Sequence, residues 1–198
     1  MQRKSLIFVC LSLILSISLL VGCAGMTAKP TEQNFQDPVI TLESMEVAHA
    51  FGYWYFSKKV KPTKGNPDNV GAPLELAFIF NIQNPNKFPV MLEDFKFTIA
   101  FEEFDLNTVS STATQWIPPG ATNQIMVPAH FDVRQSLLSL LVTGGFQLKA
   151  KNMNAWSQLE AWWTGIPDYS VPVHVKGGSA VFKADSVVKV ATFNATFP

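Results

Sequence analysis

Apolar side chains recur at every second position in several stretches of the chain downstream of Val39. In the segment LELAFIFNIQ, five such residues share one face of an extended chain and the intervening residues share the other. The positions with this period are Leu74, Leu76, Phe78, Phe80 and Ile82; Phe95, Phe97, Ile99 and Phe101; Ile125, Val127, Ala129, Phe131 and Val133; and Val171, Val173 and Val175. A period of two predicts β-strands, and several strands separated by turns predict an all-β fold, an antiparallel β-sandwich.

Two positions interrupt this alternation. Pro128 lacks a backbone N–H, so its strand is expected to lie at a sheet edge or to carry a bulge. The apolar positions change from even numbers at Val90 and Leu92 to odd numbers from Phe95 onwards. We therefore expect a bulge or break near Glu93-Asp94.

Two short segments have a helical pattern instead. The first begins with a capping-box sequence at Asp132, contains Leu137, Leu138 and Leu141, and ends at Gly144. Asn154 is expected to cap the second, in which Trp156, Leu159 and Trp163 share one face. One of the neighbours Trp162 and Trp163 is expected to pack inward, and the other is a candidate for exposure. Both helices are expected to cover an open end of the sandwich.

Residues 84–86, Asn-Pro-Asn, separate two of the predicted strands. Asn84 precedes proline, which disfavours helical backbone angles, and Pro85 has the φ angle that a turn requires. Asn86 tolerates positive φ and can bond its own backbone. These residues predict a turn rather than a ligand-binding loop. Gly144-Gly145 and Gly177-Gly178 are likewise expected to be turns or helix ends.

The same residues resemble a family signature. Asn84-Pro85-Asn86, followed by Pro89-Val90 and Leu92, is similar to the core signature of the late-embryogenesis-abundant (LEA) type 2 family, also called the WHy (water stress and hypersensitive response) domain. A proline-glycine turn at residues 117–120 and a leucine-rich helix before the last strands also fit. The resemblance covers residues 39–198 and implies an immunoglobulin- or fibronectin III-like sandwich with one or two short helices. It also implies a role in tolerance of desiccation, cold or other stress, by shielding proteins or membranes.

The N-terminus has the features of a secretory signal. Gln2-Arg3-Lys4 is basic, residues 5–21 are almost wholly apolar or serine, and small residues follow. Leu20-Val21-Gly22-Cys23 resembles the lipobox of bacterial lipoproteins, which implies acylation of Cys23 and cleavage before it. The expected organisation is a signal peptide at 1–22, a lipidated tether at 23–38 and a sandwich domain at 39–198. An uncleaved membrane anchor is the alternative.

The lipoprotein interpretation also predicts location. The protein would be anchored in the bacterial cell envelope. Because Ala24 rather than aspartate follows the cysteine, the periplasmic face of the outer membrane is favoured over the inner membrane. Cys10 lies in the segment that would be removed, so the mature chain would keep Cys23 alone and have no internal disulfide.

Composition excludes some partners and predicts little chemistry. Basic and acidic residues are balanced at 15 each, which argues against nucleic acid. The sequence has no nucleophile elbow, P-loop, dinucleotide-binding glycine motif or zinc-protease motif. His49, His130 and His174 are far apart in sequence, each in a predicted strand. Glu102, Glu103 and Asp105 are expected to form a solvated loop rather than a weak cation site. No catalytic residue, metal or cofactor is predicted.

Residues 51–56, FGYWYF, carry five aromatic side chains in six positions. One interpretation is a strand packed on both faces. The other is an interaction patch formed by Tyr53, Trp54, Tyr55 and Phe56, which would contact a membrane or a client protein. Both interpretations remain open from the sequence.

Three functions are compatible with these features. The first is a non-enzymatic, lipid-anchored envelope protein that protects proteins or membranes under stress. The second is an envelope adaptor that docks on a membrane complex or a lipid-transport complex. The third is an enzyme of unrecognised type, which would need a cleft with clustered titratable groups.

Overall fold

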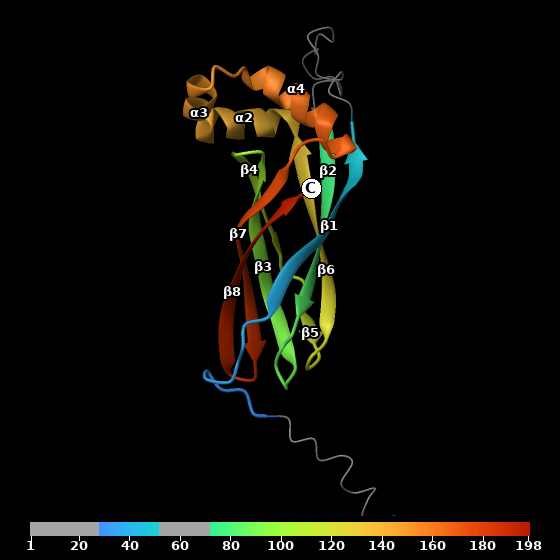
Figure 1. Cartoon of the computed structure of the whole chain (residues 1–198), viewed down its shortest axis with the longest axis vertical. Coiled ribbons are helices and arrows are strands. Elements are labelled where there is room, and N and C mark those ends of the chain that lie inside the picture. The colour runs from blue at the N-terminus through green and yellow to red at the C-terminus, as the bar shows by residue number, and fades with distance from the viewer. Residues whose placement is uncertain (1–27, 52–71) are drawn as a thin grey trace, which may run out of the picture.

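The computed structural model describes residues 28–51 and 72–198, and within these ranges the strands form two packed antiparallel sheets. The first sheet has the order β1 (Val39–Ala50), β2 (Pro73–Gln83) and β6 (Thr122–Asp132). The second has the order β4 (Phe104–Ser111), β3 (Val90–Phe101), β7 (Val173–Ala184) and β8 (Val187–Phe197), and β5 (Gln115–Ile117) also pairs with β3. The predicted all-β, immunoglobulin/fibronectin III-like sandwich is confirmed (Figure 1).

The alternating residues form the core between the two sheets. The apolar positions predicted for β2, β3 and β6 are buried. Phenylalanine rings join the sheets: Phe78 lies 5.4 Å from Phe97, and Phe80 lies 5.0 Å from Phe95, measured between ring centroids. Each fully buried phenylalanine contributes roughly 1.5–3 kcal/mol relative to an exposed one, which makes this ring cluster a major stabilising element.

Both predicted interruptions of the alternation are present. Pro128 lies in β6, an edge strand of the first sheet, and it is paired with Ala77 of β2. The pairing of β3 with β7 shifts register between Leu92 and Asp94, which places a bulge at Glu93. The missing N–H of proline and the change of apolar phase were therefore sufficient to locate these features.

The Gly177-Gly178 pair is not a turn, contrary to the sequence interpretation. It lies inside β7, where the pairing with β8 shifts register between Val175 and Gly178. Gly177 has a φ of 57°, and its N–H donates to Asn194 Oδ1 at 2.8 Å. A glycine with positive φ is typical of a β-bulge, so a local signal for a turn marks an irregularity within a long strand.

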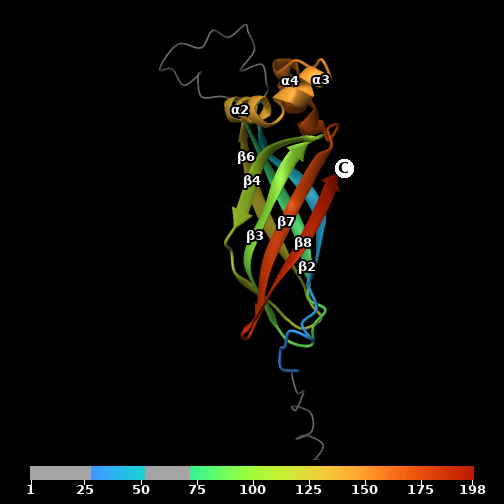
Figure 2. The ribbon, with the colours of Figure 1, turned by 90° about the vertical axis from the view of Figure 1, so that its left-hand side faces the viewer.

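Helices cover one end of the sandwich, as predicted (Figures 1 and 2). They are α2 (Val133–Thr143), α3 (Gly145–Ala150), α4 (Ala155–Gly165) and a 3-10 turn at Ile166–Asp168. Asp132 caps α2 by accepting from the N–H of Arg134, and Asn154 caps α4 by accepting from the N–H groups of Trp156 and Ser157. Both predicted N-caps are confirmed, whereas α3 was not predicted. We call residues 133–165 the helical end.

The two neighbouring tryptophans of α4 are both buried, so neither is the exposed residue that the sequence allowed for. The Trp163 indole N–H donates to the carbonyl oxygen of Ala72 at 2.8 Å, which connects α4 to the start of β2. Trp162 packs against Phe101 and Phe104. Trp156, predicted to share the inward face, is instead 45% exposed.

The segment before β1 lies at the end of the sandwich opposite the helices (Figures 1 and 2). Phe35 is buried there, and its ring meets that of Phe88 edge-on at 5.7 Å. The packed unit therefore includes residues that the sequence interpretation assigned to the tether. Within the described ranges, no helix has the length and apolar character needed to span a membrane.

Candidate functional site

The site residues predicted from the sequence lie outside the described ranges. Cys23 precedes residue 28, and Tyr53, Trp54, Tyr55 and Phe56 fall between residues 51 and 72. Lipid attachment and the aromatic interaction patch therefore stay predictions. Three features of the described residues are candidates for function: the Asn-Pro-Asn corner, a charged groove and an exposed apolar helix face.

The Asn-Pro-Asn corner is built around a buried amide. Asn84 is fully buried, and its side-chain N–H groups donate to the carbonyl oxygens of Phe88, Ile117 and Pro118 at 2.9–3.2 Å. Its Oδ1 accepts from the backbone N–H and the side-chain amide of Asn86, both at 3.0 Å. One side chain thus satisfies groups from the corner and from the end of β5, which gives it a structural role.

The second asparagine of the corner holds the segment that precedes β1. Asn86 Nδ2 donates to the carbonyl oxygen of Gln36, and Asn86 Oδ1 accepts from the N–H of Gln36, both at 2.8 Å. The amide thereby pairs with the Gln36 backbone much as a neighbouring strand would. We call this contact, together with the Phe35–Phe88 ring contact, the N-terminal clasp. Asn86 is absent from the residues with positive φ, so its tolerance of left-handed geometry is not used here.

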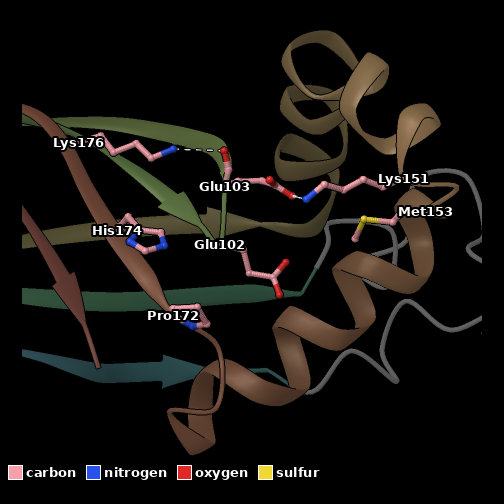
Figure 3. Close-up of a pocket in the computed structure, with 7 residues that line it drawn as sticks. All are labelled: Glu102, Glu103, Lys151, Met153, Pro172, His174 and Lys176. Atoms are coloured by element: carbon pink, nitrogen blue, oxygen red, sulfur yellow. Dashed lines mark hydrogen bonds and ion pairs between the residues drawn. The ribbon is translucent and has the colours of Figure 1, made fainter.

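A charged groove lies where the β3–β4 hairpin meets the helical end (Figure 3). It encloses about 640 Å³, is open to solvent and is lined by Glu102, Glu103, Lys151, Met153, Pro172, His174 and Lys176. Glu103 pairs with Lys151, and Lys176 pairs with Asp105 at 2.9 Å. These acidic groups therefore act in ion pairs between the hairpin and its surroundings, in line with a solvated turn.

Glu102 links the hairpin to α4, and its backbone adopts a strained conformation. Its φ of 53° is unusual for a residue with a Cβ. Its Oε2 accepts from Gln158 Nε2 at 2.9 Å and from the Trp162 indole N–H at 3.2 Å. These two bonds offset the cost of placing a glutamate at this strained position.

The histidines are dispersed over three different strands. His49 is in β1, His130 in β6 and His174 in β7. His130 Nδ1 lies 3.3 Å from a Glu75 carboxylate oxygen, and His174 Nδ1 lies 2.9 Å from Thr196 Oγ1. Among residues 28–51 and 72–198, no three histidine, cysteine or acidic side chains are grouped so that they could hold a metal.

The helical end carries an exposed apolar face that the sequence analysis did not identify. Leu138, Leu141 and Val142 of α2 are 64%, 52% and 80% exposed, and Phe146 of α3 is 91% exposed. Residues three and four apart lie on the same side of a helix, so the three α2 side chains form one surface, and Phe146 follows in α3. We call these four residues the apolar face.

A signal for this face is present in the sequence. Five of the six residues from Leu137 to Val142 are apolar, a band wider than the single stripe that a surface helix needs to contact its core. Only part of that band packs inward, where Leu140 is fully buried and Leu137 is partly buried. The excess apolar residues point to a helix with two apolar sides, one packed on the sandwich and one left to solvent.

The charge of this region differs from that of the whole chain. From Val133 to Leu159 the sequence contains Arg134, Lys149 and Lys151 and has no aspartate or glutamate, whereas the chain as a whole is balanced. Lys149 is exposed in the last turn of α3, and Lys151 is the partner of Glu103. Asp132 and Glu160 border this stretch, so the exposed cations nearest the apolar face in sequence are Arg134 and Lys149.

Comparisons with known proteins identify only distant likenesses. No family model and no curated protein matches the chain. A crystal structure of a protein from Archaeoglobus fulgidus aligns with a TM-score of 0.40 and 12% identity, over 79% of this chain and 94% of that one. A Northeast Structural Genomics Consortium target, SoR45, aligns with a TM-score of 0.40 and 11% identity, over 82% and 83%. A protein described as ApaA from Bordetella pertussis aligns with a TM-score of 0.40 and 10% identity, over 82% and 94%. Likenesses of this size carry no inference about function.

Proposed function

We propose that this chain is a lipid-anchored protein of the bacterial envelope that acts without catalysis, by contact with proteins or membranes under stress. The observation that carries the proposal is the apolar face, which lies at the end of the sandwich away from residue 28 (Figure 1). The anchor itself rests on the lipobox-like sequence at Cys23. Membership of the LEA type 2 family is part of the proposal and rests on the Asn-Pro-Asn signature.

The corner adds physical support to the family resemblance. Asn84 and Asn86 are buried and bonded to backbone groups on three separate segments, so these signature residues serve the fold. A signature that holds a sandwich together is compatible with a protein whose activity resides elsewhere. The apolar face lies at the opposite end of the sandwich and takes no part in these hydrogen bonds.

The physical route of protection would be weak competitive contact. Exposed apolar side chains remove apolar surface of a partly unfolded client from water, and this contact competes with association between clients. Such protection scales with protein concentration. It needs neither nucleotide nor metal.

The test compares two pairs of substitutions in a soluble form that begins at Thr27. Val142→Ser with Phe146→Ser removes the most exposed part of the apolar face. Trp116→Ser with Met126→Ser removes two apolar side chains of β5 and β6 that are 57% and 60% exposed. Aggregation of a labile enzyme during freezing or drying is measured by light scattering. We expect the parent and the Trp116/Met126 variant to protect, and the Val142/Phe146 variant to lose most protection.

Two results would contradict the proposal. One is protection no better than that of an inert protein at equal mass. The other is equal protection by both double variants, which would show that any apolar surface suffices. The adaptor alternative predicts instead a saturable complex of fixed stoichiometry with one envelope partner, measurable by crosslinking of the anchored protein in cells.

A further inference from the structure

We propose that the apolar face docks on a phospholipid bilayer with anionic headgroups, and that this bilayer is a second one, facing the membrane that holds the anchor. The inference deepens the proposed function and rests on it for the position of the anchor. It makes the protein a bridge between two membrane surfaces.

Exposure and shape favour a bilayer as the occupant. Phe146 and Val142 are almost fully exposed, and Leu138 and Leu141 extend the same surface along α2. These side chains are exposed on helices, and none of them lines the groove in Figure 3. A bilayer interface can remove projecting side chains from water without a complementary pocket, as amphipathic helices at membrane surfaces do.

Charge identifies the type of bilayer. Arg134 and Lys149 are exposed about one turn from Leu138 and from Phe146, whereas Lys151 is paired with Glu103, and Asp132 and Glu160 border the stretch from Val133 to Leu159. Lys149 is exposed one turn beyond Phe146, where it can reach headgroups while the ring enters the acyl boundary. Trp156, nearly half exposed at the start of α4, adds a residue type that is enriched at membrane interfaces. Anionic headgroups complement this combination.

The same charge argues against a second copy of the chain as the occupant. A twofold contact would bring the same surface of both copies together, so the cationic residues around the two faces would meet. Like charges at a contact oppose association, and in the sequence no acidic residue lies within four positions of Leu138, Leu141, Val142 or Phe146. Self-association through this face is therefore disfavoured by the sequence itself.

The fold keeps the apolar face away from the anchor. The N-terminal clasp fixes Phe35 and Gln36 to the corner, at the end of the sandwich opposite the helices (Figures 1 and 2). Five peptide links from Cys23 to Ala28 reach at most about 18 Å. The 12 residues of β1 alone span about 40 Å along the sandwich. An upright domain therefore presents the apolar face to a facing surface.

The experiment uses the full chain in its natural anchored form. The protein is reconstituted in donor vesicles of phosphatidylcholine, and protein-free acceptor vesicles contain either phosphatidylcholine alone or added phosphatidylglycerol. Capture of fluorescent acceptors is measured by co-flotation. An environment-sensitive dye on Gln147→Cys reports whether α3 enters lipid, and the parent chain treated with the same dye controls for labelling at Cys10 or Cys23.

We expect capture and a blue shift of the dye with phosphatidylglycerol acceptors, and little of either with neutral ones. The Val142→Ser/Phe146→Ser variant should lose at least about tenfold in capture, because the apolar part of the contact is removed. The Trp116→Ser/Met126→Ser variant should capture normally. Capture should fall in 1 M salt, where the screening length shortens to about 3 Å.

Several outcomes would overturn the inference. These are absence of capture, equal loss in both double variants, equal capture of neutral acceptors, and clustering of donor vesicles without acceptors, which would indicate self-association. Failure here is separable from failure of the proposed function. The aggregation assay contains no lipid and the capture assay contains no client, so each can fail while the other succeeds.

Discussion

Asn84 shows how much a single amide can determine at the residue scale. Its N–H groups face three carbonyl oxygens in a site closed to water. Asn84→Asp keeps the shape but replaces these donors with a carboxylate, which leaves the carbonyl groups unsatisfied and adds repulsion. We expect the free energy of unfolding to fall by at least about 3 kcal/mol at neutral pH, because each unsatisfied buried group costs roughly 1–3 kcal/mol.

Pro85→Ala is the matched control in the same turn. It should lower the free energy of unfolding by about 1 kcal/mol or less, through the entropy of the unfolded chain, and leave partner binding intact. Urea unfolding measures both variants. Equal effects would mean that the turn and not the amide network stabilises the corner. Lost binding with an unchanged melting temperature in Pro85→Ala would show the corner to be a recognition loop.

The turn at residues 84–86 was predictable, but its bonding was not. Proline and asparagine have local backbone preferences that act within a few residues, and these sufficed to place the end of β2 and the start of β3. The partners of the two amides lie at Gln36 and Ile117, so their positions depend on the packing of distant segments. No local preference encodes such contacts.

Glu102 offers a second test at the residue scale, because its backbone strain and its hydrogen bonds have opposite effects. Glu102→Ala removes the bonds to Gln158 and Trp162 but keeps a side chain at positive φ. Glu102→Gly removes the same bonds and relieves the strain, which is worth roughly 1–2 kcal/mol for a residue with a Cβ. We expect alanine to destabilise by about 2 kcal/mol and glycine by clearly less, measured by urea unfolding. Glycine as damaging as alanine would show that the strain is negligible.

At the scale of elements, the bulge in β7 depends on a glycine that the opposite strand covers. A Cβ at Gly178 would lie 2.5–2.7 Å from three ring atoms of Phe193, and this ring stacks on Phe95 at a centroid distance of 4.7 Å. Gly178→Ala should therefore lower the free energy of unfolding by about 1–3 kcal/mol, as overpacking does. The melting temperature of the variant measures this effect.

Gly145→Ala is the control for the bulge, because nothing lies within 4 Å of a Cβ built at that helical position. It should be neutral or stabilise by about 0.5–1 kcal/mol, since alanine favours a helix over glycine. Combining Gly178→Ala with Phe193→Leu should recover part of the lost stability. If the combination is no better than the sum of the single changes, the clash with Phe193 is not the cause.

Predictability at the element scale followed the strength of each pattern. Strands β2, β3 and β6 alternate because one face is buried, and the residues of that face were identified from the sequence, including the change of phase within β3. β4 and β5 were missed, because β4 alternates only weakly beyond Leu106 and β5 has three residues. The sequence also could not predict which side of α2 packs inward. Apolar residues occupy more than one side of this helix, and the side that becomes buried depends on how the helix packs on the ends of the sheets.

At the scale of the whole molecule, the proposed function depends on an anchor at one end. Cys23→Ser should abolish incorporation of labelled fatty acid and leave an uncleaved precursor in cells, because the thiol is the acyl acceptor that the lipobox resemblance implies. Metabolic labelling and the mass of the mature protein measure this. Normal labelling of the variant would exclude Cys23 as the attachment site, whereas a parent chain that is uncleaved and takes up no label would favour the uncleaved-anchor alternative.

The N-terminal clasp holds the segment before β1 at the end of the sandwich opposite the helical end. Asn86 bonds the backbone of Gln36 and not its side chain, so Gln36→Ala should leave the clasp intact while Asn86→Ala breaks both of its bonds to that residue. Hydrogen exchange of the full chain should therefore accelerate in residues 28–37 of Asn86→Ala and remain at the parent rate in Gln36→Ala. Exchange in β2 and β3 beyond the corner should change little, because their core phenylalanines are untouched.

The clasp also connects fold to the bridging role. Without the bonds between Asn86 and Gln36, the domain should rotate about the anchor. Asn86→Ala should therefore reduce capture of phosphatidylglycerol vesicles, although the apolar face is unchanged. Gln36→Ala should capture as the parent does. If Asn86→Ala loosens residues 28–37 but captures vesicles at the parent level, the orientation of the domain does not contribute, and contact by the apolar face needs no fixed geometry at the anchor.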